Sequence, residues 1–198
     1  HLLASLPNIL GDVSPIELGY TFCRDPLPAG VEIPAEPFHV DLLDSATVSA
    51  AVAAFVPNIV IHTAAQSSPA RASKDPETSS LTNSPECLLD ALDALPERPF
   101  LVYISTDQVF GGDAAPYAPS DPPCPVNDYG NSKLAFERLL ETKWGHHFAV
   151  LRSSNMCGPP SPYTGITKFL QWLEPRLSAS DPNQVELFTD EIRSFISV

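Results

Sequence analysis

The sequence predicts an α/β fold built as a doubly wound parallel sheet. Short apolar runs rich in β-branched and aromatic residues, such as 58–64 and 100–105, alternate with longer segments that carry helix caps. Polar residues directly follow several of these runs, and ligands bind at the carboxyl ends of strands in such sheets. The chain has 198 residues, 43% of them hydrophobic, which is enough for one domain with a buried core.

The first half of the chain is expected to alternate strands and helices. After a helix end at residues 1–6, we expect strands at 17–23 and 38–41. Asp44 is a helix cap for residues 45–55, which are rich in alanine and end before a proline. A buried strand follows at 58–64. Asp75 and Pro76 then begin a helix that runs to about Leu95, with a kink or restart at Pro85.

The second half continues the alternation. Residues 100–105 form the next buried strand, and a long loop with two glycines and a proline cluster separates it from a helix at 126–143. The remaining expected elements are a strand at 148–153, a helix at 164–177 and a last strand at 185–188. The chain thus keeps the strand–helix order of a parallel sheet to its end.

Charge and composition exclude several classes of protein. The formal net charge is -13, and so acidic a surface repels phosphate backbones, so we expect no nucleic-acid partner. The most apolar region, 48–65, is broken by proline, asparagine and histidine, so we expect no membrane span. The cysteines lack metal-ligand or CxxC spacing, which predicts no metal site and reduced thiols in the cytoplasm.

Tyr129 and Lys133 lie in the stretch DYGNSK and share one face of the predicted helix. An ammonium group near a phenol lowers the tyrosine pKa, so Tyr129 could pass a proton to a carbonyl oxygen as hydride reaches the carbon. Thr106, at a strand end, could fix that oxygen. Random placement of the tyrosines and lysines would give about 0.1 such pairs, so the spacing alone is suggestive but does not decide between catalysis and coincidence. The position of the pair after a strand that ends in Ser-Thr-Asp favours catalysis.

VYISTDQVF, PVNDYGNSKLAFE and AVLRSSNMCGP resemble the extended short-chain dehydrogenase/reductase superfamily. Within it they are most similar to the dTDP-4-dehydrorhamnose reductase-like (RmlD-like) group, which includes the regulatory beta subunit of methionine adenosyltransferase. The resemblance implies a Rossmann-like domain that binds NADP or NAD, with Thr106, Tyr129 and Lys133 as catalytic residues. Gln108 departs from the group's usual tyrosine.

The resemblance also implies further cofactor contacts. They are Asp41 and Leu42 in HVDLLD, Ala64 and Ala65 in IHTAAQ, Asn83, Ser105, and Tyr129 and Lys133 themselves. For two of these the residues leave alternatives open, because Asp41 could instead cap a loop and Asn83 could be a polar residue on a half-exposed helix.

Two other polar side chains have competing interpretations. His62 lies on an apolar strand, where a hydrogen-bonded core histidine is the better hypothesis. Arg152 could meet substrate phosphates or form a structural ion pair.

Two functions from different classes remain open. The first is an NAD(P)H-dependent reductase of a 4-keto nucleotide sugar. The second is a non-catalytic NADP-binding regulatory subunit that binds the methionine adenosyltransferase catalytic subunit, in S-adenosylmethionine biosynthesis. A third hypothesis is that this exact chain is an inactive truncated product.

No glycine-rich turn of the group's G-x-x-G-x-x-G type occurs in the sequence. We therefore expect the chain to begin inside the first βα unit, to leave a gap in the sheet at the central strand, and to bind the cofactor poorly. The expected domains are an NAD(P)-binding part at 1–160, incomplete at its N-terminus, and the start of a truncated substrate-binding part at 161–198.

Overall fold

The computed structural model describes residues 16–27, 34–158, 169–177 and 194–197. These residues fall into two compact units. The larger contains residues 18–26 and 35–153, and the other contains the described residues from 154 onward. The elements expected at 1–6 and 185–188 lie outside the described residues, and the expected domain boundary at residue 160 stays a prediction.

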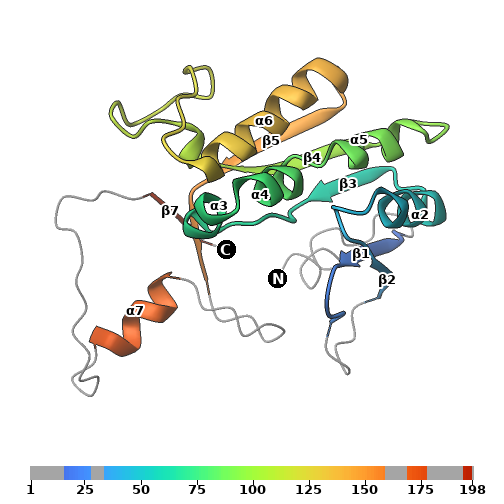
Figure 1. Cartoon of the computed structure of the whole chain (residues 1–198), viewed down its shortest axis with the longest axis horizontal. Helices are drawn as coiled ribbons and strands as arrows, with labels where there is room; N and C mark the ends of the chain where they lie inside the picture. The colour runs from blue at the N-terminus through green and yellow to red at the C-terminus, as the bar shows by residue number, and fades with distance from the viewer. Residues whose placement is uncertain (1–15, 28–33, 159–168, 178–193, 198) are drawn as a thin grey trace. The chain divides into compact units, whose positions relative to one another are not determined.

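The larger unit contains two parallel sheets (Figure 1). In the first, β1 (Leu18–Phe22) pairs with β2 (Ala35–His39). The second has the order β3 (Ile59–His62), β4 (Phe100–Thr106), β5 (Phe148–Ser153). Among the described residues no strand pairing joins β1 to β3. The predicted α/β fold with parallel strands is confirmed, and the gap expected at the central strand stays a prediction.

Helices connect the strands, and two of them begin at the predicted caps, Asp44 and Asp75. The helices are α2 (Ser45–Phe55), α3 (Pro69–Lys74), α4 (Pro76–Asn83), α5 (Glu86–Asp93) and α6 (Asp128–Lys143). The Asp44 carboxylate accepts from the Ala46 backbone N–H at 3.0 Å, and the Asp75 carboxylate accepts from that of Thr78 at 3.1 Å. Each cap satisfies a backbone N–H that has no partner inside its helix.

The helix expected from residue 76 to about 95 restarts at Pro85, as predicted, and so forms two helices, α4 and α5. Two other predictions need correction. Helix α3 was not predicted, although Ser68 caps it and Pro69 takes its first position. Strand β2 begins at Ala35 and includes Pro37, since an edge strand can place a residue without an N–H on its unpaired side.

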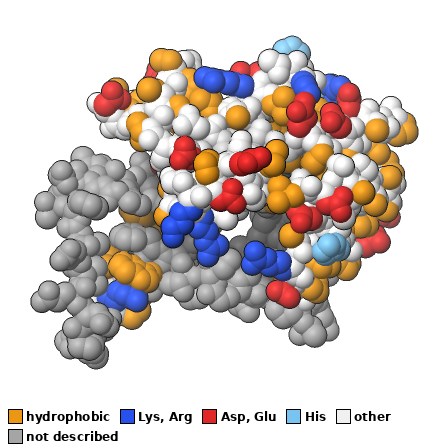
Figure 2. Space-filling model, viewed as in Figure 1, with side chains coloured by type: hydrophobic (Ala, Val, Ile, Leu, Met, Phe, Trp, Pro, Cys, Tyr) orange, Lys and Arg blue, Asp and Glu red, His pale blue; other side chains and the backbone are white. Residues whose placement is uncertain are grey.

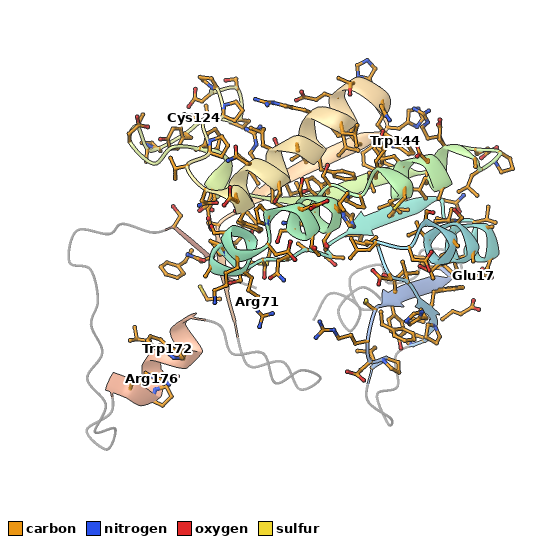
Figure 3. All side chains as sticks on the ribbon, in the orientation of Figure 1. Glu17, Arg71, Cys124, Trp144, Trp172 and Arg176 are labelled. Carbon is orange, nitrogen blue, oxygen red and sulfur yellow. The ribbon has the colours of Figure 1, made fainter. Side chains whose placement is uncertain are left out.

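The core of the larger unit lies between the three-stranded sheet and helices α5 and α6. From β4, Leu101 and Tyr103 are fully buried. They belong to one apolar cluster that also contains Leu92 of α5, Phe136 of α6, and Trp144 just after α6 (Figure 3). Helix α2 adds Val48 to the same cluster and packs against α5. This packing fixes the start of α6 against the end of β4.

The opposite face of the three-stranded sheet is apolar and more exposed. Ile59 of β3 is 64% exposed, and its register partner Phe100 of β4 is 41% exposed. Leu151 of β5, which pairs with Ile104, is 52% exposed. The sheet therefore buries one face only against the helices of its own unit.

Charged side chains are distributed over the described surface. In the view of Figure 2, acidic side chains lie among hydrophobic and basic ones rather than in one patch. No helix in the described ranges is long and apolar enough to cross a membrane.

The other unit has a short parallel pair and one helix. Strand β6 (Asn155–Cys157) pairs with β7 (Phe195–Ser197), and neither was predicted. Helix α7 (Phe169–Leu177) falls within the helix expected at 164–177. In α7 the Arg176 guanidinium lies over the Trp172 ring, 4.4 Å from its centre (Figure 3).

Candidate active site

Thr106 and Tyr129 meet where β4 ends and α6 begins. Thr106 is the last residue of β4 and caps a short 3-10 helix, η1 (Asp107–Val109), by accepting from the Gln108 N–H at 3.2 Å. Tyr129 lies in the first turn of α6, and its phenol is close enough to the Thr106 hydroxyl for that hydroxyl to act on the pKa of Tyr129. Two of the three predicted catalytic residues are thus brought together from positions 23 residues apart.

The contact between η1 and α6 depends on Gly130. A Cβ atom at Gly130 would lie 2.3 Å from the backbone oxygen of Gln108 and 3.0 Å from the Pro125 side chain. Asn127 strengthens the same junction, because its side chain accepts from the Gly130 N–H at 2.8 Å and donates to the Gln108 Oε1 at 2.9 Å. Gln108, which departs from the pattern of the resembling group, therefore helps to lock the helix start.

Replacing Gly130 by alanine is expected to destabilise the protein by about 1–3 kcal/mol, because the obstructing atom belongs to the backbone and cannot rotate away. To make room for the added methyl group, the start of α6 must move away from η1, and this movement should separate Thr106 from Tyr129. Urea unfolding measures the first effect. Ala135→Gly, at an exposed position in the same helix, is the control for helix propensity and should cost no more than about 1 kcal/mol. Equal stability of Gly130→Ala and wild type would contradict the close approach.

The phenol of Tyr129 is not activated in the way the sequence predicted. Burial raises the pKa of Tyr129 above its ordinary value; the nearby Thr106 hydroxyl opposes this shift, and the Asp107 charge adds to it. The sequence predicted a lowered pKa for Tyr129, and the direction of the shift is the opposite. Tyr129 is therefore a neutral phenol near neutral pH, a form that can give up a proton but cannot take one.

Lys133 is buried and its ammonium points elsewhere. Only 1% of the residue is exposed, and Nζ lies 4.2 Å from the centre of the Tyr103 ring on β4. Burial lowers the pKa of Lys133 to about 8, while the Glu137 carboxylate acts in the opposite direction. Around neutral pH most of the population is charged, and an ammonium over a ring face is a favourable arrangement.

His62 is a core residue, as predicted, but its hydrogen bonding differs. Its ring stacks on Tyr103, with 5.6 Å between ring centres, and contacts Phe136 at 5.5 Å. Its Nε2 has no hydrogen-bond partner in the described part of the chain, so the expected hydrogen bond is missing at that atom. Burial, then the charge of Lys133, lowers the pKa of His62 to about 3.

Asn83 joins three elements around the site. Its Oδ1 accepts from the Gln66 N–H at 2.7 Å, and its Nδ2 donates to the Gln66 carbonyl at 3.2 Å and to the Ser132 hydroxyl at 2.8 Å. Asn83 is fully buried at the end of α4, so the half-exposed alternative is wrong. Both amide hydrogens are used within the protein, and contact with a cofactor stays a prediction.

The remaining predicted cofactor residues lie after β2 and β3. The Asp41 carboxylate accepts from the Leu43 N–H at 2.9 Å, so it does shape the loop. Leu42 packs partly buried against the core. Ala64 is exposed and Ala65 half-buried in the irregular segment after β3, at the same end of the sheet as Thr106. Their cofactor contacts stay predictions.

Ser105 faces a buried ion pair between Glu137 and Arg152. From the sequence, the role of Arg152 had remained open. Its hydroxyl donates to the carboxylate of Glu137, which also receives the guanidinium of Arg152 at 2.7 Å. Glu137 was not a candidate, although its place four residues after Lys133 on the same helix face was a readable signal. Arg152 forms the structural ion pair that was one of its two predicted roles.

Two hollows in the larger unit lie apart from Thr106 and Tyr129. One of about 300 Å³ lies between α2 and α5, and the other of about 400 Å³ lies between α6 and residues 119–123. Neither is lined by the predicted catalytic residues, so we place the candidate site by its chemistry and its position at the strand ends.

A family model described as the RmlD substrate binding domain matches residues 17–192, most of the chain. The chain belongs to the RmlD substrate-binding domain family. The resemblance seen in the sequence is thereby confirmed, and Thr106, Tyr129 and Lys133 all lie inside the matched residues of this RmlD-family chain.

Individual relatives fall into two groups. Methionine adenosyltransferase 2 subunit beta of Xenopus tropicalis is 39% identical over 52% of this chain and 30% of its own length. A probable low-salt glycan biosynthesis reductase, Agl14, of Haloferax volcanii is 32% identical over 78% of the chain and 51% of its own. The RmlD-family chain thus spans between about a third and a half of these curated relatives.

Solved structures support the same fold. A dTDP-4-dehydrorhamnose reductase of Bacillus anthracis, solved in complex with NADP, is 28% identical to this chain. Its TM-score is 0.58, and the match covers 69% of this chain and 50% of the bacterial one. The RmlD-family chain therefore has the Rossmann-like α/β fold of these nucleotide-sugar reductases.

Proposed function

We propose that this chain carries the proton-transfer half of an NAD(P)H-dependent reductase that acts on a 4-keto nucleotide sugar. The observation that carries the proposal is that Thr106 and Tyr129 meet at the carboxyl end of β4, with a neutral phenol on Tyr129. The related reductase crystallised with NADP supports the cofactor class. A cytoplasmic location is part of the same proposal.

The residues at the end of β4 fit the nicotinamide end of such a cofactor, because they offer hydroxyl donors beside a buried lysine. When bound, reduced nicotinamide supplies a hydride to the carbonyl carbon. Tyr129 gives its phenol proton to the carbonyl oxygen, which becomes the alcohol, and the resulting phenolate is reprotonated from solvent. Thr106 holds the carbonyl oxygen and the phenol in line. Lys133 supplies positive charge near the ribose.

The proposal is tested by following the absorbance of NADPH with a dTDP-4-keto-6-deoxy sugar. The cofactor is given at millimolar concentration, because the sequence lacks the glycine-rich turn that would hold the pyrophosphate. We expect slow oxidation that needs both the sugar and the folded protein. A cooperatively folded chain without any sugar-dependent oxidation would overturn the reductase assignment.

A second candidate function is a regulatory subunit of methionine adenosyltransferase. The beta subunit from Xenopus tropicalis, at 39% identity, favours it. Binding of the methionine adenosyltransferase catalytic subunit to this chain, without sugar reduction, would decide for this function.

A further inference from the structure

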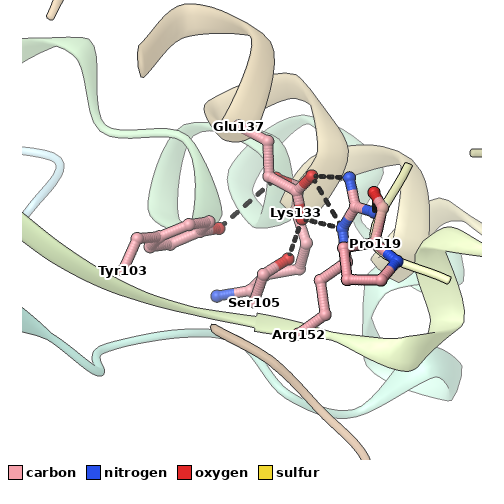
Figure 4. Close-up of polar contacts among 6 residues, drawn as sticks. All are labelled: Tyr103, Ser105, Pro119, Lys133, Glu137 and Arg152. Carbon is pink, nitrogen blue, oxygen red and sulfur yellow. Dashed lines mark hydrogen bonds and ion pairs between the residues drawn. The ribbon is translucent and has the colours of Figure 1, made fainter. Parts of the chain in front are cut away.

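Glu137 is a buried carboxylate one turn after Lys133 on α6, and only 2% of it is exposed. Its oxygens accept from the Ser105 hydroxyl on β4 and from Arg152 on β5 (Figure 4). The Arg152 Nε lies 3.1 Å from Oε2 and 3.3 Å from Oε1, and Nη2 lies 2.7 Å from Oε2. Donors from two strands thus converge on this carboxylate and make charge-assisted hydrogen bonds to it.

Arg152 is itself fixed on two further sides. Its guanidinium lies 5.0 Å from the centre of the Phe110 ring, and its Nη1 donates to the Pro119 carbonyl at 3.2 Å. Phe110 in turn stacks on Tyr117, with 4.5 Å between ring centres. The ion pair is therefore held by β5 and by the loop between η1 and α6, and the position of Glu137 is well determined.

Several titratable groups surround the Lys133 ammonium. Tyr103 presents its ring from β4, His62 lies beyond that ring on β3, and Tyr129 precedes Lys133 on the same helix. Burial raises the pKa of both tyrosines and lowers that of His62, so all three are neutral at pH 7. Of the described groups around the ammonium, Glu137 is the one that carries negative charge.

We propose that Glu137, held in place by Arg152 and Ser105, is a positioning residue that keeps Lys133 in its charged form over the Tyr103 ring. The effect of Glu137 on the charge of Lys133 does not depend on the proposed function. Only the role of that charge in binding the cofactor rests on it. Without Glu137, burial would act on Lys133 unopposed. A neutral lysine could not attract a ribose hydroxyl electrostatically.

The titration of Lys133 tests this directly. Protein labelled with ¹³C-lysine is followed by NMR from neutral to alkaline pH, and the Lys133 signal is identified by its loss in Lys133→Met. We expect a midpoint near the pKa of about 8 in the wild type and a fall of about 1 pH unit in Glu137→Gln. The matched control is Glu141→Gln, which removes the same charge at an exposed position one turn further along α6 and should leave the midpoint unchanged.

Other outcomes are equally decisive. An unchanged midpoint in Glu137→Gln, or an equal fall in both variants, overturns the proposal. Glu137→Asp keeps the charge and should restore a midpoint above that of Glu137→Gln. A Glu137→Gln chain that does not fold shows that the carboxylate serves the fold, which also overturns the proposal. Because the titration contains neither cofactor nor sugar, failure of the reductase assay leaves this result unaffected.

Discussion

Tyr129→Phe is expected to lower the turnover of the 4-keto sugar by about 10²–10⁴-fold, because it removes the one proton that the proposed mechanism delivers to the carbonyl oxygen. The ring stays, so packing at the start of α6 is preserved, and affinity for NADPH should change little. The rates of sugar-dependent NADPH oxidation for the two proteins give the ratio directly.

The matched control is Tyr117→Phe, which deletes the same hydroxyl in the loop after η1. There the Tyr117 oxygen donates to Asp113 and accepts from the Ala114 N–H, and we expect a rate within a few-fold of wild type. If both variants lost turnover equally, the loss would be due to general disorder of the loop and not to the missing Tyr129 proton. A rate in Tyr129→Phe that matches wild type would remove Tyr129 from the chemistry.

The pH dependence of the rate separates the two titrating groups. The raised pKa of Tyr129 keeps the phenol protonated, so its own effect appears only above the ordinary tyrosine value of about 10. A decline with a midpoint near pH 8 instead reports loss of the charge on Lys133. Such a decline should move to lower pH in Glu137→Gln.

His62 is expected to make the protein sensitive to acid. The pKa of His62 is about 3 in the folded state and about 6.5 in the unfolded chain. Between these values the unfolded state binds more protons, so stability falls as the pH falls. The loss is about 1.4 kcal/mol per pH unit, or roughly 2–3 kcal/mol between about pH 6.5 and pH 4.5.

His62→Phe should abolish this loss. Phenylalanine retains the ring contacts with Tyr103 and Phe136 and removes the Nε2 atom that has no described partner. At pH 7 we expect unchanged stability or a gain of about 1 kcal/mol, because a buried polar atom is no longer desolvated. Urea unfolding at several pH values gives the free energies of unfolding.

The control for His62 is His146→Phe, at an exposed position after α6. It should lose stability with acid as the wild type does. If His62→Phe loses stability between pH 6.5 and pH 4.5 as steeply as the wild type, the buried histidine is not the source of the acid sensitivity.

The sequence predicted helices and strands well where they depend on interactions between residues that are close in the chain. Asp44 and Asp75 cap helices because their carboxylates reach backbone N–H groups two or three residues away. The strand at 148–153 has the predicted bounds, and the apolar run that predicted it is continuous. Strand β2 was placed three residues late, because tolerance of Pro37 depends on which side of β2 is paired.

The candidate site also has features that the sequence predicts and features that depend on the tertiary structure. The sequence by itself determined the family and the parallel α/β fold, and it selected Thr106, Tyr129 and Lys133 as candidates, because motif spacing and strand ends are properties of the chain. Only the tertiary structure decided the charge states. Burial keeps Tyr129 neutral, turns Lys133 over the Tyr103 ring and leaves its charge dependent on Glu137. Desolvation and Coulomb interactions depend on which atoms surround a group in space, and residues as far apart in sequence as His62 and Lys133 become neighbours only when the sheet and α6 pack together.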